Sequence, residues 1–127
     1  MGRKNIIYTY KMLDSKDLDT SVNSTATVTT TIDHMSINIV WSGSTGTNTG
    51  AIVVQGTNKD PDASDFVAAD YFDLTLSGGD INLTGASGEH IVIFDKIPFR
   101  AIRLAYTNST HSAGTVSAIM SAKTIGA

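Results

Sequence analysis

The sequence predicts an all-β protein, a jelly roll or another antiparallel β-sandwich of about eight short strands. Apolar and polar residues alternate in short runs along the 127-residue chain, as they do in strands with one buried face. Each run is bounded by Gly, Asn, Ser or Asp. The strong helix formers are not concentrated in any long stretch. These observations favour extended, half-buried chain throughout.

The clearest strand pattern lies in residues 35–56. Met35, Ile37, Ile39 and Trp41 alternate along the first half of this stretch, and residues 51–55 resume the pattern. A run of Ser, Gly, Thr and Asn separates the two halves. We therefore predict a β-hairpin with a long, flexible connection. Because it carries the only tryptophan, its inner face should meet the centre of the core.

Further strands are expected on both sides of this hairpin. Residues 65–76 are ambiguous, because they fit either a helical turn followed by a strand or a mostly extended chain; the alternation at their end favours extended chain. The acidic stretch around the Asp60-Pro61 step is expected to be a surface loop. The remaining predicted strands are residues 5–13, 21–32, 80–84, 89–95, 99–106 and 115–123.

The length favours a single domain. We expect residues 1–20 to form an N-terminal strand and loop that could act as a partner-contacting arm. Residues 21–127 are expected to form one sandwich domain. Residues 5–13 carry apolar side chains on both faces, so this strand is expected to be covered on both sides, in one arrangement by a neighbouring subunit.

Composition excludes several classes of partner. The net charge is −3 and the sequence has no basic stripe, which argues against nucleic-acid binding. The chain has no cysteine for a disulfide or a thiolate metal site. No apolar run approaches the roughly 20 residues of a membrane helix, and the start of the chain does not resemble a signal peptide. We therefore expect no membrane association.

No metal site is predicted. His34, His90 and His111 are far apart in the sequence, and none belongs to a spaced ligand pair. A second candidate is a calcium loop with oxygen ligands at alternate positions, which lacks the glycine and the bidentate glutamate that such loops need. A solvated acidic turn is the favoured interpretation. The residues of this loop are Asn58, Asp60, Asp62, Ser64 and Asp65, with Ala63 and Ala69 at the two deficient positions.

The sequence also lacks a catalytic motif. It contains no G-x-S-x-G nucleophile elbow, and no recognisable motif places a second carboxylate beside Glu89. We predict no catalytic residue and no cofactor, and we expect the protein not to be an enzyme. The aromatic side chains could form a platform for a sugar, although core or subunit packing explains them better. They are Tyr8, Tyr10, Trp41, Tyr71 and Tyr106.

Several short segments follow one another in a familiar order. Trp-Ser-Gly at 41–43 and a Gly/Thr loop precede Ile-Val-Val-Gln-Gly-Thr-Asn at 52–58. Pro-Phe-Arg-Ala-Ile-Arg-Leu-Ala-Tyr-Thr at 98–107 precedes a small-residue strand that ends in Ser-Ala-Lys at 121–123. This order, over about residues 30–123, resembles the small jelly-roll domains of structural proteins of tailed bacteriophages, including capsid decoration (cement) proteins.

The resemblance implies a non-enzymatic component of the virion that binds and stabilises the phage head through protein–protein contacts. Its expected partners are the major capsid protein or another virion protein, and copies of itself in a homo-oligomer, with a trimer favoured. The alternatives are a neck, tail or fibre component that binds a receptor or a carbohydrate, and a cellular β-sandwich domain. The first strand is the predicted contact with a partner. Its candidate residues are Arg3, Lys4, Ile6, Ile7, Tyr8, Tyr10 and Met12.

Overall fold

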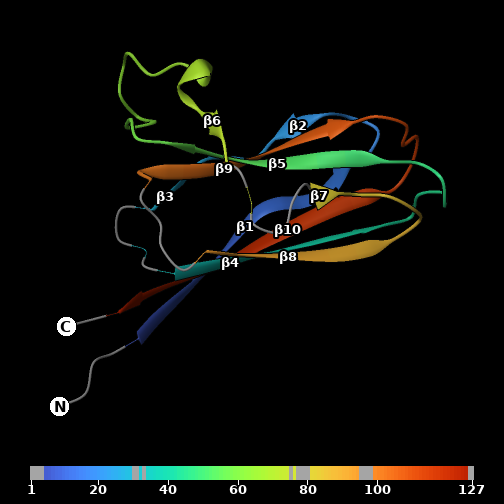
Figure 1. Ribbon diagram of the computed structural model, residues 1–127, viewed down its shortest axis with the longest axis horizontal. Coiled ribbons are helices and arrows are strands. Elements are labelled where there is room, and N and C mark those ends of the chain that lie inside the picture. The colour runs from blue at the N-terminus through green and yellow to red at the C-terminus, as the bar shows by residue number, and fades with distance from the viewer. Residues whose placement is uncertain are drawn as a thin grey trace.

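Two antiparallel β-sheets pack face to face (Figure 1), which confirms the predicted all-β sandwich. The computed structural model describes residues 5–29, 32, 34–74, 76, 81–94 and 99–125, and for residues 5–7, 28, 124 and 125 it describes the backbone alone.

One sheet has four strands in the order β1, β10, β4, β8. Each strand pairs antiparallel with its neighbour, so β1 and β8 form the two edges. The register between β1 and β10 shifts on either side of Leu13. The four strands are β1 (Asn5–Asp17), β10 (Thr115–Ile125), β4 (His34–Ser42) and β8 (Gly88–Phe94).

The other sheet has six strands centred on β9 and β5. The single strand predicted over residues 21–32 is broken into β2 and β3, which both pair with β9. Between them the Ser24 amide donates to the Leu104 carbonyl at 2.8 Å, and the Ser24 hydroxyl accepts from the Leu104 amide at 2.8 Å. A side chain thus makes one of the two hydrogen bonds with which Ser24 and Leu104 pair. The six strands are β2 (Val22–Asn23), β3 (Thr27–Val28), β9 (Ala101–Asn108), β5 (Gly50–Thr57), β6 (Phe72–Asp73) and β7 (Ile81–Asn82).

The order of the strands is that of a jelly roll. β2 and β3 both pair with β9, and β6 and β7 both pair with β5, so each of these two pairs corresponds to one interrupted strand. The chain then has eight strands, ordered first, eighth, third, sixth in one sheet and second, seventh, fourth, fifth in the other. Every strand except the fifth, which pairs only with the fourth, therefore pairs with at least one neighbour that does not adjoin it in the strand sequence.

The predicted hairpin over residues 35–56 is wrong, because β4 and β5 lie in different sheets. β4 pairs with β10 and β8, whereas β5 pairs with β9, β6 and β7. The apolar faces of the two strands therefore oppose each other across the core. Alternation shows which residues of a strand face inward but not which strand lies beside it. The connection of seven residues, 43–49, is long enough to cross from one sheet to the other, so β4 and β5 need not pair with each other.

The core fills the space between the two sheets. The inward face predicted for residues 35–41 is confirmed, and Trp41 belongs to the core as expected. Alternate residues of β9 and β10 are buried in the same core. Tyr106 is buried as well, and its hydroxyl donates to the Leu18 carbonyl at 2.7 Å. The cluster is Met12, Leu13, Leu18, Ile32, Met35, Ile37, Ile39, Trp41, Ile52, Val54, Ile81, Leu83, Val92, Ile102, Leu104, Tyr106, Val116, Ala118, Met120 and Ala122.

The N-terminal segment is part of the sandwich. β1 continues to Asp17, through residues predicted to form a loop, and it contributes Met12 and Leu13 to the core. Its pairing with β10 runs from Asn5 opposite Ile125 to Asp17 opposite Thr115. The start of β1 and the end of β10 project together beyond the rest of the sheet in Figure 1. Any contact that β1 makes with a partner would therefore use an edge strand that is already paired on one side.

Candidate functional site

The structure describes the side chains of only three of the seven predicted contact residues of the first strand. Arg3 and Lys4 lie outside the described residues, and Ile6 and Ile7 are described only as backbone paired with β10. The side chains of Tyr8 and Tyr10 are 41% and 38% exposed, whereas Met12 is buried in the core. Only the two tyrosines are therefore seen to offer a surface.

Tyr8 and Tyr10 form a stacked pair at the β1 edge of the sandwich. Their ring centroids are 6.4 Å apart and the ring planes are inclined by 28°. They lie opposite Ala122 and Met120 of β10, whose side chains point into the core. The tyrosines thus belong to the inner face of the sheet but lie where this face opens to solvent. A groove of about 500 Å³ separates this part of β1 from residues 25–27.

The outer face of the four-stranded sheet exposes a larger apolar surface, which we call the docking face. It carries four of the eight large apolar side chains that the described part of the chain exposes. Ile93 is 71% and Ile91 is 55% exposed, and Val40 and Ile119 are each about 40% exposed. Sequence reasoning missed this surface. The signal was present, because residues 89–95 are apolar on both faces, which a strand with one solvated face does not require.

The strand register gathers these four side chains. Asn38 lies between Ile119 and Ile91, directly opposite each of them. Val40 is two residues further along β4, and so is a diagonal neighbour of both isoleucines on the same face. Ile93 follows Ile91 on β8. Lys11 lies opposite Ile119 and Glu89 lies opposite Val40, so one basic and one acidic residue border the apolar group.

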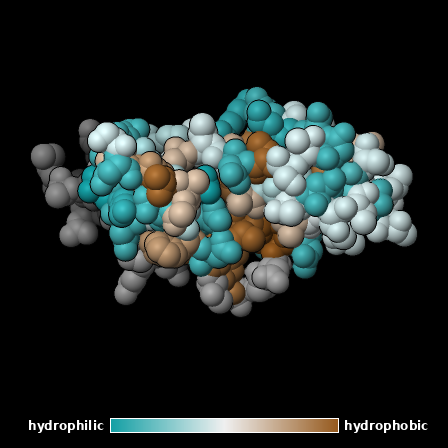
Figure 2. Space-filling view, turned by 90° about the horizontal axis from the view of Figure 1, so that it is seen from above, coloured by the Kyte–Doolittle hydropathy of each residue, from teal (hydrophilic) through white to brown (hydrophobic). Residues whose placement is uncertain are grey.

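The outer face of the six-stranded sheet is different. Figure 2 looks onto this side of the molecule and shows hydrophilic and neutral residues over most of it, with smaller hydrophobic areas. A chain of polar contacts crosses β9, β5 and β6. The Arg103 Nε donates to Gln55 at 2.8 Å, and the Gln55 amide donates to Asp73 at 2.8 Å. The Arg103 guanidinium also lies 4.0 Å from the centre of the Tyr71 ring.

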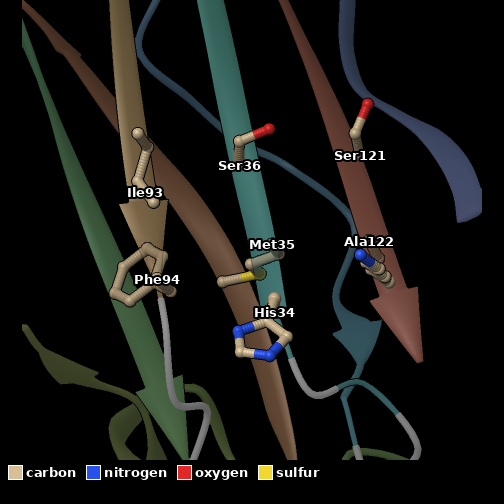
Figure 3. Close-up of a pocket in the computed structure, with 8 residues that line it drawn as sticks. His34, Met35, Ser36, Ile93, Phe94, Ser121 and Ala122 are labelled. Carbon is tan, nitrogen blue, oxygen red and sulfur yellow. The ribbon is translucent and has the colours of Figure 1, made fainter. Parts of the chain in front are cut away.

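A pocket of about 510 Å³ lies at one end of the docking face. The close-up in Figure 3 shows the labelled lining side chains on three neighbouring strands, β8, β4 and β10. Its apolar walls include Met35, Ile93 and Phe94, and Ser36 and Lys123 add polar groups. We call this the strand-end pocket. It also includes His34, which the sequence had left without a role.

Residues 57–73 form a second exposed feature, which we call the acidic lobe. It contains the loop considered as a calcium site and one turn of 3-10 helix, Ala68–Asp70, before β6. The amide of Val67 and the ammonium group of Lys59 both donate to Asp70, so they hold the pKa of its carboxyl below its usual value. Within the described residues, no group of three or more His, Asp or Glu side chains is placed to hold a metal ion.

His111 is buried and fixed by hydrogen bonds on both ring nitrogens. Its Nε2 lies 2.7 Å from the Leu83 carbonyl, which can only accept, so Nε2 carries a proton. In the neutral ring Nδ1 then accepts from the Ser44 hydroxyl. The backbone amide of His111 donates to Asn108 at 2.9 Å. These bonds join three separate loops, so we interpret the Ser–His pair as a structural clamp.

The chain resembles solved structures in fold. The SPBc2 prophage-derived protein YomS superposes with a TM-score of 0.59 and 10% sequence identity, over 95% of this chain and 96% of that one. A chain of infectious bursal disease virus, strain Gx, has a TM-score of 0.51 and 12% identity. The matched region covers 99% of this chain but 33% of the viral chain, so this chain spans about a third of the length of the viral protein. No protein-family model and no curated protein sequence matches this chain.

These likenesses establish a fold that a prophage-derived protein shares over its whole length. At such low identity they assign no residue a role. The described part of the chain has no helix that is both long and apolar enough to cross a membrane.

Proposed function

We propose that the protein is a non-enzymatic structural component of a virion that binds neighbouring virion proteins through its docking face. Within this class we propose a capsid decoration, or cement, protein that adds contact area to the phage head. The major capsid protein is its proposed partner, and copies of this chain are proposed to form a homo-oligomer.

The observation that carries this proposal is the exposed apolar surface on one face of the four-stranded sheet. Scattered single apolar residues are normal on a protein surface, but a contiguous group bordered by polar side chains indicates a binding surface. Here Ile91, Val40 and Ile119 surround Asn38, and Ile93 extends the group toward the strand-end pocket. An exposed apolar group on a sheet face, bordered by polar and charged residues, suits a protein surface better than a small, polar substrate.

The fold supports the same class. A jelly roll closes both layers over one core, and its likeness to YomS extends over nearly all of both chains. The order of motifs along the sequence also resembles the jelly-roll domains of phage structural proteins. Fold alone does not determine function, so the proposal depends on the exposed face.

A second candidate function is carbohydrate or receptor binding by a neck, tail or fibre component. The observation in its favour is the stacked, partly exposed pair of Tyr8 and Tyr10 beside the groove. Aromatic faces pack against the apolar faces of sugar rings, and Thr25 and Lys11 could supply polar contacts there. The other aromatic side chains of the predicted platform do not join this pair, because Trp41 and Tyr106 are buried in the core.

The test is the protein composition of purified particles from the phage or prophage that encodes the chain. Heads and tails are separated on a density gradient, and copies per particle are measured by quantitative mass spectrometry. A decoration protein should be found on heads at a fixed ratio to the major capsid protein. Recovery only with tails, together with a positive glycan array, would favour the second candidate. Absence from all particles would contradict both.

A further inference from the structure

We propose that copies of this protein bind one another head to tail, with Phe72 of the acidic lobe inserted into the strand-end pocket of the next copy. This contact differs from the proposed binding to the virion, since it joins two copies of the same chain, although the pocket and the docking face share Ile93.

Phe72 is the projecting element. Its side chain is 69% exposed on the short strand β6, and Val67 nearby is 57% exposed. Aromatic side chains, phenylalanine among them, are enriched in protein interfaces relative to the rest of the surface. β6 is held in place by its pairing with β5 and by the contact of Asp73 with Gln55. Phe72 is therefore presented on a fixed strand.

The strand-end pocket is the complementary element. It is an open hollow of about 510 Å³, and its apolar lining consists mainly of the exposed Ile93 and the partly buried Phe94, with the buried Met35 behind them. The labelled side chains of Met35 and Phe94 lie close together in Figure 3. The pocket is formed by strands of the four-stranded sheet, whereas β6 belongs to the other layer (Figure 1). The two features lie in different layers, toward the same end of the sandwich (Figure 1), and we infer that they meet between molecules.

Charge favours the same pairing. The acidic lobe contains five aspartates and one lysine, for a formal charge of −4, whereas the whole chain carries −3. The remainder of the protein is thus slightly positive, and Lys123 lies in the lining of the pocket. An acidic lobe that approaches Lys123 of another copy gains attraction, whereas two acidic lobes repel each other. This difference selects lobe-to-pocket contact over lobe-to-lobe contact.

A contact between two different surfaces of the same chain is heterologous. Repetition of such a contact gives a closed ring if the rotation between copies closes, and a filament if it does not. A ring leaves no lobe free, and a filament leaves one free lobe at one end and one free pocket at the other. A dimer joined by a single contact can therefore add further copies. The homo-oligomer expected from the sequence would then be built by this contact.

The test is light scattering of the isolated protein over a range of concentrations. The wild type should show a mass that rises above the 13.4 kDa of one chain. Phe72→Ser removes the projecting side chain, and Ser36→Glu places a negative charge in the pocket; each should stay at the mass of one chain. We expect the dissociation constant to increase about 30-fold or more in either variant, the scale of an interface hot spot. Ile119→Ser, on the docking face but outside the pocket lining, is the control and should associate as the wild type does.

A mixture of the two variants gives the sharpest result. The Ser36→Glu protein keeps its lobe and the Phe72→Ser protein keeps its pocket, so an equal mixture should form one species of twice the single-chain mass. A two-fold symmetric interface would not be restored in this way. A wild type that remains a single chain at all concentrations would overturn the proposal, and so would variants that assemble as well as the wild type. Neither result depends on whether the protein is found in particles.

Discussion

Gly88 lies directly opposite Trp41 where β8 pairs with β4, and the indole ring occupies the space that a side chain at Gly88 would fill. Glycine weakens a strand interior, but it also marks positions where another group approaches the backbone closely. The start of β8 is such a position. The glycine lets the only tryptophan of the chain lie against the sheet at the end of the core.

We predict that Gly88→Ala destabilises the fold. The new methyl group would overlap the indole ring, so Trp41 or β8 must shift. Overpacking of this kind lowers the free energy of unfolding by about 1–3 kcal/mol. Urea denaturation followed by the fluorescence of Trp41 would measure the change. Gly46→Ala is the matched control, since a side chain there would contact nothing within 4 Å, and equal losses in the two variants would contradict the explanation.

A second prediction concerns the buried hydroxyl of Tyr106. Tyr106→Phe keeps the ring in the core but removes the 2.7 Å hydrogen bond to the Leu18 carbonyl. A buried acceptor without its donor costs about 1–2 kcal/mol of stability, and we expect a loss of that size in chemical denaturation. Tyr10→Phe, at an exposed site, should change stability by less than about 0.5 kcal/mol. Similar values for the two variants would show that the Leu18 contact is unimportant.

The third prediction is a loss of stability at alkaline pH. Burial raises the pKa of Tyr106, and the carboxylate of Asp19 raises it further. Burial also raises the pKa of Tyr71, although Arg103 opposes this. The unfolded chain releases its phenolic protons near pH 10, while the folded protein retains them to higher pH. The free energy of unfolding should therefore be unaffected by these groups below about pH 10 and decrease above it.

Urea titrations between pH 8 and pH 11 would measure this dependence. Tyr106→Phe lacks one of the two groups, so its stability should decrease less steeply above pH 10 than that of the wild type. An unchanged slope in this variant would show that Tyr106 does not contribute.

Alternation along the chain predicted most of the strands but not their partners; over residues 65–76, where extended chain was favoured, the structure has a 3-10 turn at Ala68–Asp70 and then the short strand β6. Met35, Ile37 and Ile39 face inward as predicted, because the two-residue period fixes the face of each residue. The same period is satisfied whether β5 lies beside β4 or across the core from it. In the structure β10 and β8 pair with the two sides of β4, so no side is left for β5. These strands are distant in the sequence, and a local pattern does not show that they pair with β4.

The candidate site was less predictable for a related reason. Tyr10 and Met12 are two residues apart and were expected to share one contact surface. The register shift between Lys11 and Leu13 interrupts the alternation, however, and Met12 lies in the core. By contrast, the sequence shows that residues 89–95 are apolar on both faces, but only the sheet order shows that the side with Ile91 and Ile93 has no covering layer among the described residues.

The last prediction tests the docking face itself. Ile91→Thr keeps a β-branched side chain in β8, so strand propensity is retained while an apolar surface group is replaced by a hydroxyl. Because Ile91 is 55% exposed, stability should change by no more than about 0.5 kcal/mol. Incorporation into particles, measured as copies per head, should fall at least about tenfold if Ile91 is an anchor of the interface. Val53→Thr, on the outer face of the other sheet, is the matched control and should be incorporated normally. If the Ile91→Thr protein folds and is incorporated at the wild-type level, the virion contact lies elsewhere, and the exposed Tyr8–Tyr10 pair becomes the next surface to mutate.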